Sequence, residues 1–381
     1  MRVPFNIPYL TGKEEEYILA ALKSRAHCGN NEFSKRCIAF MKKKYGFSEV
    51  FLNTSCSTAM EMGAMLAGVG PGDEVILPSY TFSSTANAVL RQGARPVFCE
   101  IEPDTMNIDV AKINALITKK TKMIIPVDYA GIPCDIDPIM EIAHRHNLIV
   151  MVDAAQSFHS FYKGKPAAAI PDLAAFSFHE TKNVTCGEGG ALVVNKPEWI
   201  ERAHFLQEKG TDRKLVLDGV KNKYQWVDIG SSFLLSDILA AMLLAQIEEV
   251  ENMVQERAKL TFAYYTLLEP YEKAGRITIP HPPAHTEVNH HAFFVIFDIK
   301  ENRQRFLALL REKEISAYIG YVPLHSSTMG LRLGYKPEDL PLTEDIGSRI
   351  VRLPFYTDLP KNGMDYCITE MKNVLSTLYE H

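Results

Sequence analysis

The stretch LIVMVDAAQ, residues 148–156, is a short apolar run that ends in a carboxylate followed by two alanines and a glutamine. A continuous run of this length, rich in β-branched residues, predicts a strand that is buried on both faces. Five more runs of this kind occur: EVFLN (49–53), EVILP (74–78), RPVFCE (95–100), KMIIPV (122–127) and GALVVN (190–195). Most are separated by segments of helical length, such as 57–68, 83–92 and 136–146. This alternation predicts an α/β fold with a mainly parallel sheet covered by helices on both faces.

The pattern differs on either side of this region. Before it, residues 13–25 and 35–45 carry apolar residues at helical spacing. After it, residues 233–269 form one long helical stretch without Gly or Pro, which a Pro-rich segment at 278–291 ends. We then expect a strand at 292–299, a helix at 301–313, a strand at 315–319 and a helix at 364–379. Two domains are predicted: a large α/β domain at 1–240, which includes the N-terminal helices, and a connecting helix with a smaller C-terminal α/β domain at 241–381.

Charge and cysteine content exclude several classes of protein. The 381 residues carry a formal net charge of −5, which gives no attraction to nucleic acid or to an anionic membrane. The seven cysteines are scattered and lack C-x-x-C pairs, so neither a disulfide framework nor a structural zinc site is expected. His144, His146, His290 and His291 have no further metal ligands nearby, and we expect no metal. The absence of a secretory signal and of a run of ~18 apolar residues favours a cytoplasmic protein.

Residues that directly follow strands are the first candidates for a functional site, because parallel sheets bind ligands beyond the carboxyl ends of their strands. NTSCSTAMEM (53–62) follows one strand and opens a helix with several hydroxyl residues. Ser55, Ser57 and Thr58 can cap this helix, while its N-terminus, with free amides and a partial positive charge, can bind a phosphate. The segment by itself is consistent with either role.

Asp153 and Lys182 follow two other strands. Asp153 emerges at the end of an apolar run, where a buried carboxylate needs a cation or hydrogen-bond donors. It can cap a helix, pair with an arginine or meet a cationic ring nitrogen. Lys182 lies in SFHETKNVTCGEGG (177–190), in which the glycines allow a close approach of the backbone. It is either a surface lysine or, in desolvated surroundings, an amine nucleophile that also moves protons.

These three strand ends together match the needs of one cofactor, pyridoxal 5′-phosphate (PLP). PLP requires a lysine for a Schiff base, an acid at its pyridine nitrogen and an anion pocket for its phosphate. Their order and placement therefore predict a PLP enzyme. A nicotinamide-dependent oxidoreductase also uses a parallel sheet and a helix N-terminus, but it requires G-x-G-x-x-G after an early strand, and NTSCSTA (53–59) contains no glycine.

Five motifs resemble one known family: PSYTF (78–82), DAAQ (153–156), SFHETKNVTCGEGGA (177–191), DIGSSFLLSDILAA (228–241) and YVPLH (321–325). They are similar to motifs of the DegT/DnrJ/EryC1/StrS family of PLP-dependent nucleotide-sugar aminotransferases. The resemblance covers nearly the whole chain and implies the type I aminotransferase fold, with a seven-stranded-type sheet in the large domain. Four segments most resemble the branch that makes dTDP-4-amino-4,6-dideoxygalactose for surface polysaccharides from dTDP-4-keto-6-deoxyglucose and L-glutamate: CGNNEFSKRC (28–37), HETKN (179–183), EKGTDR (208–213) and KYQWVDIGSS (223–232).

The resemblance implies roles for individual residues around the cofactor ring. Lys182 would hold PLP covalently, and Asp153 would pair with its pyridinium nitrogen. Gln156 would lie beside the phenolic oxygen, and Phe82 would stack on the ring face. The deoxysugar dehydratases of the family carry histidine at the lysine position, so Lys182 favours transamination. The presence of Lys182, Asp153 and Gln156 also disfavours a non-catalytic regulator.

The resemblance also implies a phosphate site and a shared active site. Cys56, through its backbone amide, Ser57 and Ser177 fall where the family holds the phosphate. Ser232 stands where many relatives have an asparagine that reaches the phosphate of the neighbouring subunit's cofactor. A homodimer with an active site shared between subunits is therefore expected.

The substrate-binding residues are less closely defined by the sequence. His179, Arg213 and His325 are candidates for contacts with the sugar, and each histidine is equally consistent with a satisfied polar residue. The densest basic stretch either binds the nucleotide diphosphate or is a solvated loop: Lys209, Arg213, Lys214, Lys221 and Lys223. Amination at C3 or C4, and the configuration of the new amine, depend on how the sugar lies over the cofactor. The preference for C4 and the galacto product comes from the resemblance alone.

Overall fold

The computed structural model describes residues 1–379, and its main feature is a seven-stranded sheet. The sheet has the order β1-β9-β8-β5-β4-β2-β3. Its strands are β1 (Glu49–Asn53), β2 (Glu74–Pro78), β3 (Arg95–Cys99), β4 (Thr121–Ile124), β5 (Ile149–Asp153), β8 (Leu173–Ser177) and β9 (Gly190–Val194). Strand β9 is antiparallel to both its neighbours, whereas the pairs among β8, β5, β4, β2 and β3 are parallel. The predicted α/β fold with a mainly parallel sheet is confirmed.

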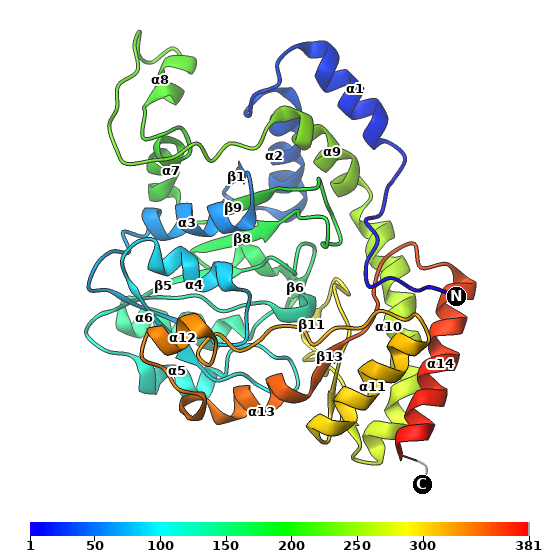
Figure 1. The fold of residues 1–381 in the computed structure, drawn as a ribbon. Helices are drawn as coiled ribbons and strands as arrows, with labels where there is room; N and C mark the ends of the chain where they lie inside the picture. The colour runs from blue at the N-terminus through cyan, green and yellow to red at the C-terminus, as the bar shows by residue number, and fades with distance from the viewer. Residues whose placement is uncertain (380–381) are drawn as a thin grey trace.

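Helices cover both faces of this sheet (Figure 1). The helices of this part of the chain are α1 (Glu14–Ser24), α2 (Glu32–Tyr45), α3 (Cys56–Leu66), α4 (Ser83–Leu90), α5 (Val110–Leu116), α6 (Ile136–His146), α7 (Ile200–Gln207), α8 (Arg213–Leu217) and α9 (Asp237–Glu248). Helices α2, α5, α6 and α9 share one apolar cluster with Val150 and Val152 of β5, and α3, α4 and α7 share another with Met151. Because successive strand residues point to opposite faces and both faces are covered, the central residues of most strands are apolar.

The C-terminal part forms a third apolar cluster around a small sheet of order β10-β12-β13. Its strands are β10 (Ile277–Thr278), β12 (Phe294–Phe297) and β13 (Ile350–Arg352). The helices α10 (Val250–Lys273), α11 (Lys300–Glu312) and α14 (Lys361–Tyr379) lie together in this part (Figure 1). The remaining elements are α12 (Thr328–Arg332), α13 (Pro341–Arg349) and the strands β6 (Phe161–Tyr162), β7 (Lys165–Pro166) and β11 (Thr286–Glu287). The domain boundary at residue 240 stays a prediction.

Two expectations about the C-terminal half are corrected by the structure. The stretch 233–269 is not one helix, because α9 ends at Glu248 and α10 begins at Val250. Glu249 between them has a non-helical backbone, and its carboxylate accepts hydrogen bonds from Lys13 and Asn252. Residues 315–319 form isolated bridges instead of a strand, because Ile315 pairs with the N-terminal segment while Tyr318 pairs with β13.

No helix among residues 1–379 is long and apolar enough to cross a membrane.

The predicted helices at 13–25, 57–68, 136–146 and 301–313 correspond to α1, α3, α6 and α11 within a few residues. The arrangement that matters for function lies at one edge of the large sheet, where β1, β5 and β8 end and the antiparallel β9 begins.

Candidate active site

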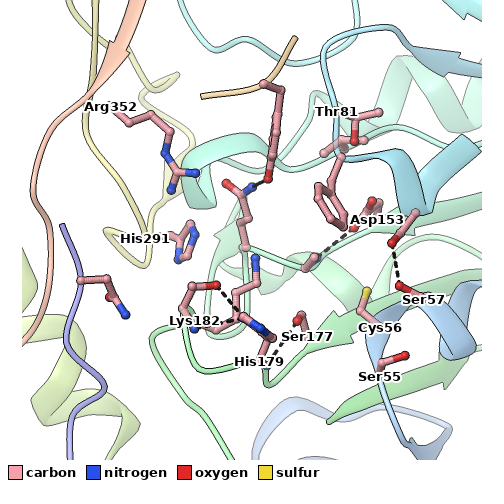
Figure 2. Close-up of a pocket in the computed structure, with 18 of the residues that line it drawn as sticks. Ser55, Cys56, Ser57, Thr81, Asp153, Ser177, His179, Lys182, His291 and Arg352 are labelled. Atoms are coloured by element: carbon pink, nitrogen blue, oxygen red, sulfur yellow. Dashed lines mark hydrogen bonds between the residues drawn. The ribbon is translucent and has the colours of Figure 1, made fainter. Parts of the chain in front are cut away.

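A cavity of about 520 Å³ opens at this edge of the sheet. Its lining includes Asp153 and Ser177, the last residues of β5 and β8, and Cys56, the first residue of α3. Lys182 from the loop after β8 extends into the same space (Figure 2). Parallel strands place their carboxyl ends together, which explains how residues far apart in sequence come to share one cavity.

The N-terminus of α3 leaves backbone amides free at the cavity wall. Ser55 is the N-cap: its hydroxyl accepts from the Thr58 amide, and the Thr58 hydroxyl accepts from the Ser55 amide, both at 3.1 Å. The next two amides, of Cys56 and Ser57, lie in the first turn, where no carbonyl of the same helix can reach them. Different residues therefore serve the two roles: Ser55 caps the helix, while the backbone amides of Cys56 and Ser57 remain available to bind an anion.

Gly190, at the start of β9, keeps this helix end accessible. A Cβ atom on Gly190 would overlap the backbone of Ser55 and Cys56. Ser57 is tied to the N-terminus of α4 by a 2.6 Å hydrogen bond between its hydroxyl and that of Ser84. The helix end therefore forms a shallow cradle of amides and hydroxyls, of a kind that binds phosphate.

Asp153 is a buried carboxylate without a salt bridge in residues 1–379, and 4% of its surface is exposed. Its Oδ2 accepts a 2.7 Å hydrogen bond from the Thr85 hydroxyl, and its Oδ1 accepts a 3.2 Å hydrogen bond from the Ala155 amide. Burial raises the pKa of Asp153, and the bond from Thr85 opposes that rise. The alternative of an arginine partner is therefore not realised, and the carboxylate is free to meet a cation in the cavity.

Lys182 is partly buried and has an unusually acidic ammonium group. Burial, and next the nearby charge of Arg352, lower the pKa of Lys182 to about 8. The loop is held by Asn183, whose side chain donates a 2.7 Å hydrogen bond to the carbonyl of Asn289. A lysine that is substantially neutral near pH 8 can act as a nucleophile and as a base.

Gln156 and Phe82 lie on the same cavity as predicted. The Gln156 Oε1 accepts a 2.7 Å hydrogen bond from the Ala130 amide, and its Nε2 donates to the Tyr321 hydroxyl at 3.1 Å. Phe82 precedes α4 and leaves 57% of its surface exposed at the cavity. An aromatic face this open is available to stack on a planar ligand.

Several cavity residues were not singled out from the sequence as site residues. His291 is buried; its Nδ1 lies 3.0 Å from Oδ1 of Asn183. Because the Asn183 amide group donates to Asn289, its oxygen is the acceptor, so His291 Nδ1 carries the hydrogen and Nε2 has the free lone pair. Burial, with the charges of Lys182 and Arg352, lowers the pKa of His291 and keeps the ring neutral.

Tyr321 and Arg352 also border the cavity. Tyr321 lies within the motif YVPLH (321–325), in which only His325 was a candidate site residue. Arg352 and Thr85 carry no local signal, because they reach the site only through the packing of β13 and α4.

Three of the predicted site residues lie away from this cavity. The expectation that His325 contacts the sugar is corrected: it is 0% exposed, and its Nδ1 and Nε2 bond the Ser79 hydroxyl at 2.7 Å and the Pro337 carbonyl at 3.2 Å. Arg213 starts α8 and lies 3.8 Å from Glu208. Ser232 is exposed and bridges Glu208.

His179 does reach the cavity. Its Nε2 lies 3.7 Å from Glu188, and its Nδ1 lies 3.0 Å from the Thr181 hydroxyl. These partners occupy both ring nitrogens while the ring remains at the cavity rim. The structure is consistent with a contact to a ligand, and the role of His179 stays a prediction.

The polar groups that line the cavity fit the chemical requirements of PLP. Around one cavity lie a buried carboxylate that has no ion pair within the described residues, an amine with a lowered pKa and a helix end kept open by Gly190. PLP supplies, when bound, a carbonyl that accepts amines and a ring that takes up electrons from the adjacent carbon. The fold and the site together define a PLP-dependent aminotransferase.

The comparisons with known proteins agree with this class. The chain belongs to the DegT/DnrJ/EryC1/StrS aminotransferase family, whose sequence profile matches residues 9–372. It is 30% identical to the spore coat polysaccharide biosynthesis protein SpsC of Bacillus subtilis, in an alignment that covers 98% of this chain and 97% of that protein. It is also 30% identical to GDP-perosamine synthase of Caulobacter vibrioides, with 98% of each chain covered. The PLP-form of Spr1654 from Streptococcus pneumoniae, named as a sugar aminotransferase, superposes with a TM-score of 0.90 at 26% identity, covering 99% of this chain and 100% of that one.

Proposed function

We propose that the protein transfers the amino group of L-glutamate to C4 of dTDP-4-keto-6-deoxyglucose and so forms dTDP-4-amino-4,6-dideoxygalactose for a surface polysaccharide. The observation that carries the transamination is the joint placement of Lys182 and Asp153 on one cavity. The sugar substrate is supported by the branch motifs HETKN (179–183) and KYQWVDIGSS (223–232). The names of GDP-perosamine synthase and of the spore coat polysaccharide protein also point to sugar metabolism for surface structures.

The proposed roles of the ring-binding residues follow from their chemistry. Lys182 holds the cofactor and, once released by the incoming amine, carries a proton to and from the reacting carbon; a positioned base of this kind contributes about 10²- to 10⁴-fold in rate. Asp153 keeps the pyridine nitrogen protonated, since a buried carboxylate gains from a cationic partner. Gln156 lies by the phenolic oxygen, and Phe82 covers one ring face.

The phosphate of the cofactor is proposed to bind at the start of α3. The amides of Cys56 and Ser57 and the hydroxyls of Ser57 and Ser177 supply donors, and the helix N-terminus adds a favourable partial charge. Anion binding there needs no basic side chain. This suits a protein with a net charge of −5.

A homodimer is proposed from the exposed apolar side chains of one segment. Trp226 is 79% exposed, and four neighbours are also exposed: Leu217, Val220, Tyr224 and Ile229. This segment, which includes α8, extends away from the rest of the chain (Figure 1). Contiguous apolar side chains of this size are typical of protein interfaces. In such a dimer the segment would bring Ser232 and the basic stretch toward the partner's cavity.

We also propose that the protein acts in the cytoplasm.

The test uses the visible spectrum of the purified protein with PLP. Addition of L-glutamate should convert the yellow lysine-bound cofactor to pyridoxamine phosphate in the wild type and in Lys259→Ala, a control on the exposed face of α10. Lys182→Ala should not show the lysine-bound form. A wild type that never forms it contradicts the proposal.

The substrate is tested separately with the pyridoxamine form. It is offered dTDP-4-keto-6-deoxyglucose, its 3-keto isomer and the GDP-linked 4-keto sugar in parallel. NMR of the product then gives the aminated carbon and its configuration. A C3-aminated or gluco-configured product overturns the proposed regiochemistry, and loss of the C3 hydroxyl without amination indicates a dehydratase.

A further inference from the structure

Arg352 borders the cavity, and within residues 1–379 its guanidinium has no anionic partner. Its Nε is buried, and within residues 1–379 the guanidinium forms no hydrogen bond or ion pair. Its contact is the Phe5 ring, whose centroid lies 5.5 Å from Cζ. A buried N–H of a charged group that lacks an acceptor is costly, and a ligand that supplies an anion removes that cost.

Arg257, a buried arginine nearby, already has hydrogen-bond acceptors. The Nε of Arg257 donates to the carbonyl of His290 at 2.8 Å, and its Nη2 donates to the carbonyls of His291 and Phe355 at 2.6 and 3.4 Å. Arg257 therefore belongs to the wall of the site. Arg352 is the guanidinium that remains free for a ligand.

The backbone of Arg352 is fixed at the rim of the cavity. It ends β13, pairs with Phe294 of β12 and exchanges two hydrogen bonds with Tyr318, at 2.6 and 3.1 Å. Figure 2 shows Arg352 beside His291, across the cavity from the start of α3 at Ser55. Arg352 and the proposed phosphate site at α3 therefore lie on different sides of the cavity in this view.

The free guanidinium lies close to the reacting amine. After burial, its charge is the largest influence that lowers the pKa of Lys182, ahead of the opposite effects of Cys56 and Asp153. An anion held by Arg352 would thus sit beside the atom at which the amino group is exchanged. In an α-amino acid the carboxylate and the amine share one carbon, whereas the diphosphate of a nucleotide sugar is attached at C1, across the ring from C4.

We propose that Arg352 binds the α-carboxylate of the amino donor, an inference that rests on the proposed transamination. The planar guanidinium offers two parallel N–H donors to the two carboxylate oxygens. Binding also neutralises the charge that depresses the basicity of Lys182. The lysine therefore becomes a stronger base when the donor is in place, at the stage at which it must accept a proton.

The experiment compares Arg352→Gln and Arg352→Lys with the wild type and with Arg276→Met. Arg276 is a matched control, because its guanidinium also lies 5.5 Å from a ring, that of Tyr379, and it does not line the cavity. Binding of glutarate, a dicarboxylate without an amine, is measured by calorimetry on the PLP-loaded protein. The two half-reactions are followed separately, with L-glutamate and with the keto sugar.

We expect Arg352→Gln to weaken glutarate binding and to raise the half-saturating L-glutamate concentration by about 10- to 100-fold, the value of a hydrogen bond to a charged group. Arg352→Lys should be intermediate, because it keeps the charge and loses the paired donors. The keto-sugar half-reaction should change less than about twofold, and Arg276→Met should match the wild type.

Unchanged glutarate binding in both Arg352 variants would overturn the inference. Equal losses in the two half-reactions would also overturn it, because they would assign Arg352 to the diphosphate or to the packing of the site. If Arg352→Gln does not fold, Arg352→Lys carries the same comparison. A wild type that binds glutarate but does not react with L-glutamate contradicts the proposed function, while weaker glutarate binding in the Arg352 variants would still support the carboxylate site.

Discussion

Replacing Thr85 by valine would test how the protein controls the charge of Asp153. Valine has nearly the same shape as threonine, and Thr85 is fully buried, so the change removes a hydroxyl with little effect on volume. The hydroxyl donates a 2.7 Å hydrogen bond to Oδ2 of Asp153. In its absence the carboxylate keeps one protein donor, the Ala155 amide at 3.2 Å.

The size of the effect should depend on pH. A hydrogen bond to a charged group contributes about 1.5–3 kcal/mol, and one between neutral groups about 0.5–1.5 kcal/mol. Burial raises the pKa of Asp153 above its value in the unfolded chain, so the stability linked to this group is present at low pH and is lost as the pH rises through the folded-state pKa. Removing the Thr85 bond raises the folded-state pKa further. The loss of stability in the variant should therefore grow as the pH rises, and it should approach about 1.5–3 kcal/mol once Asp153 is ionised.

The assay is chemical denaturation of the cofactor-free protein at a series of pH values that includes pH 5 and pH 8. Thr185→Val is the matched control: Thr185 is also buried, but its hydroxyl bonds the backbone carbonyl of Phe178 and the amide of Gly187. Its loss of stability should not change between pH 5 and pH 8. The same pH-independent loss in Thr85→Val would refute the idea that Thr85 stabilises a charged Asp153.

Three further predictions address other parts of the site. The rate at which PLP forms its lysine adduct with the cofactor-free protein should rise with pH, with a midpoint at about 8, the pKa of Lys182, because the neutral amine is the nucleophile. A midpoint near the pKa of an exposed lysine, about 10.4, would contradict this prediction. Gly190→Ala should lower PLP affinity and stability together, since its Cβ would displace the first turn of α3, and equilibrium dialysis with PLP is the measurement. His325→Gln should lower the free energy of unfolding by about 1–3 kcal/mol, because the ring bonds Ser79 and Pro337 away from the cavity. The KM for the sugar should stay unchanged. A raised KM in fully folded variant protein would instead place His325 in the substrate site.

The local parts of the fold follow from local patterns. The short apolar runs that end at Asn53, Pro78 and Asp153 are strands of the sheet, and the segment 136–146 is the helix α6. Each of these elements can be predicted from a few neighbouring residues, through the spacing of apolar side chains, the presence of β-branched residues and a capping residue. The break at Glu249 has no comparable sequence signal, and one partner of its carboxylate, Lys13, lies more than two hundred residues earlier.

The site was predictable to the extent that it lies at strand ends. Asp153, Lys182 and the start of α3 could be selected because each directly follows an apolar strand, and the structure brings them to one cavity. His325 could not be separated from a substrate contact by sequence, since its burial is decided by partners at Ser79 and Pro337. Thr85 and His291 could not be selected from the sequence, because each is linked to the site by a bond to a residue far away in the chain: Thr85 to Asp153 and His291 to Asn183.

The sequence by itself determined the fold class, the family and the strand ends at which the chemistry is placed. The tertiary structure decided which of the polar residues meet: it placed Thr85 against Asp153, buried His325 and left Arg352 near Lys182 without an ion pair among residues 1–379. The physical reason is that strand and helix patterns act over a few residues. Contacts across a sheet edge, in contrast, depend on strand order and on how the C-terminal part packs over it.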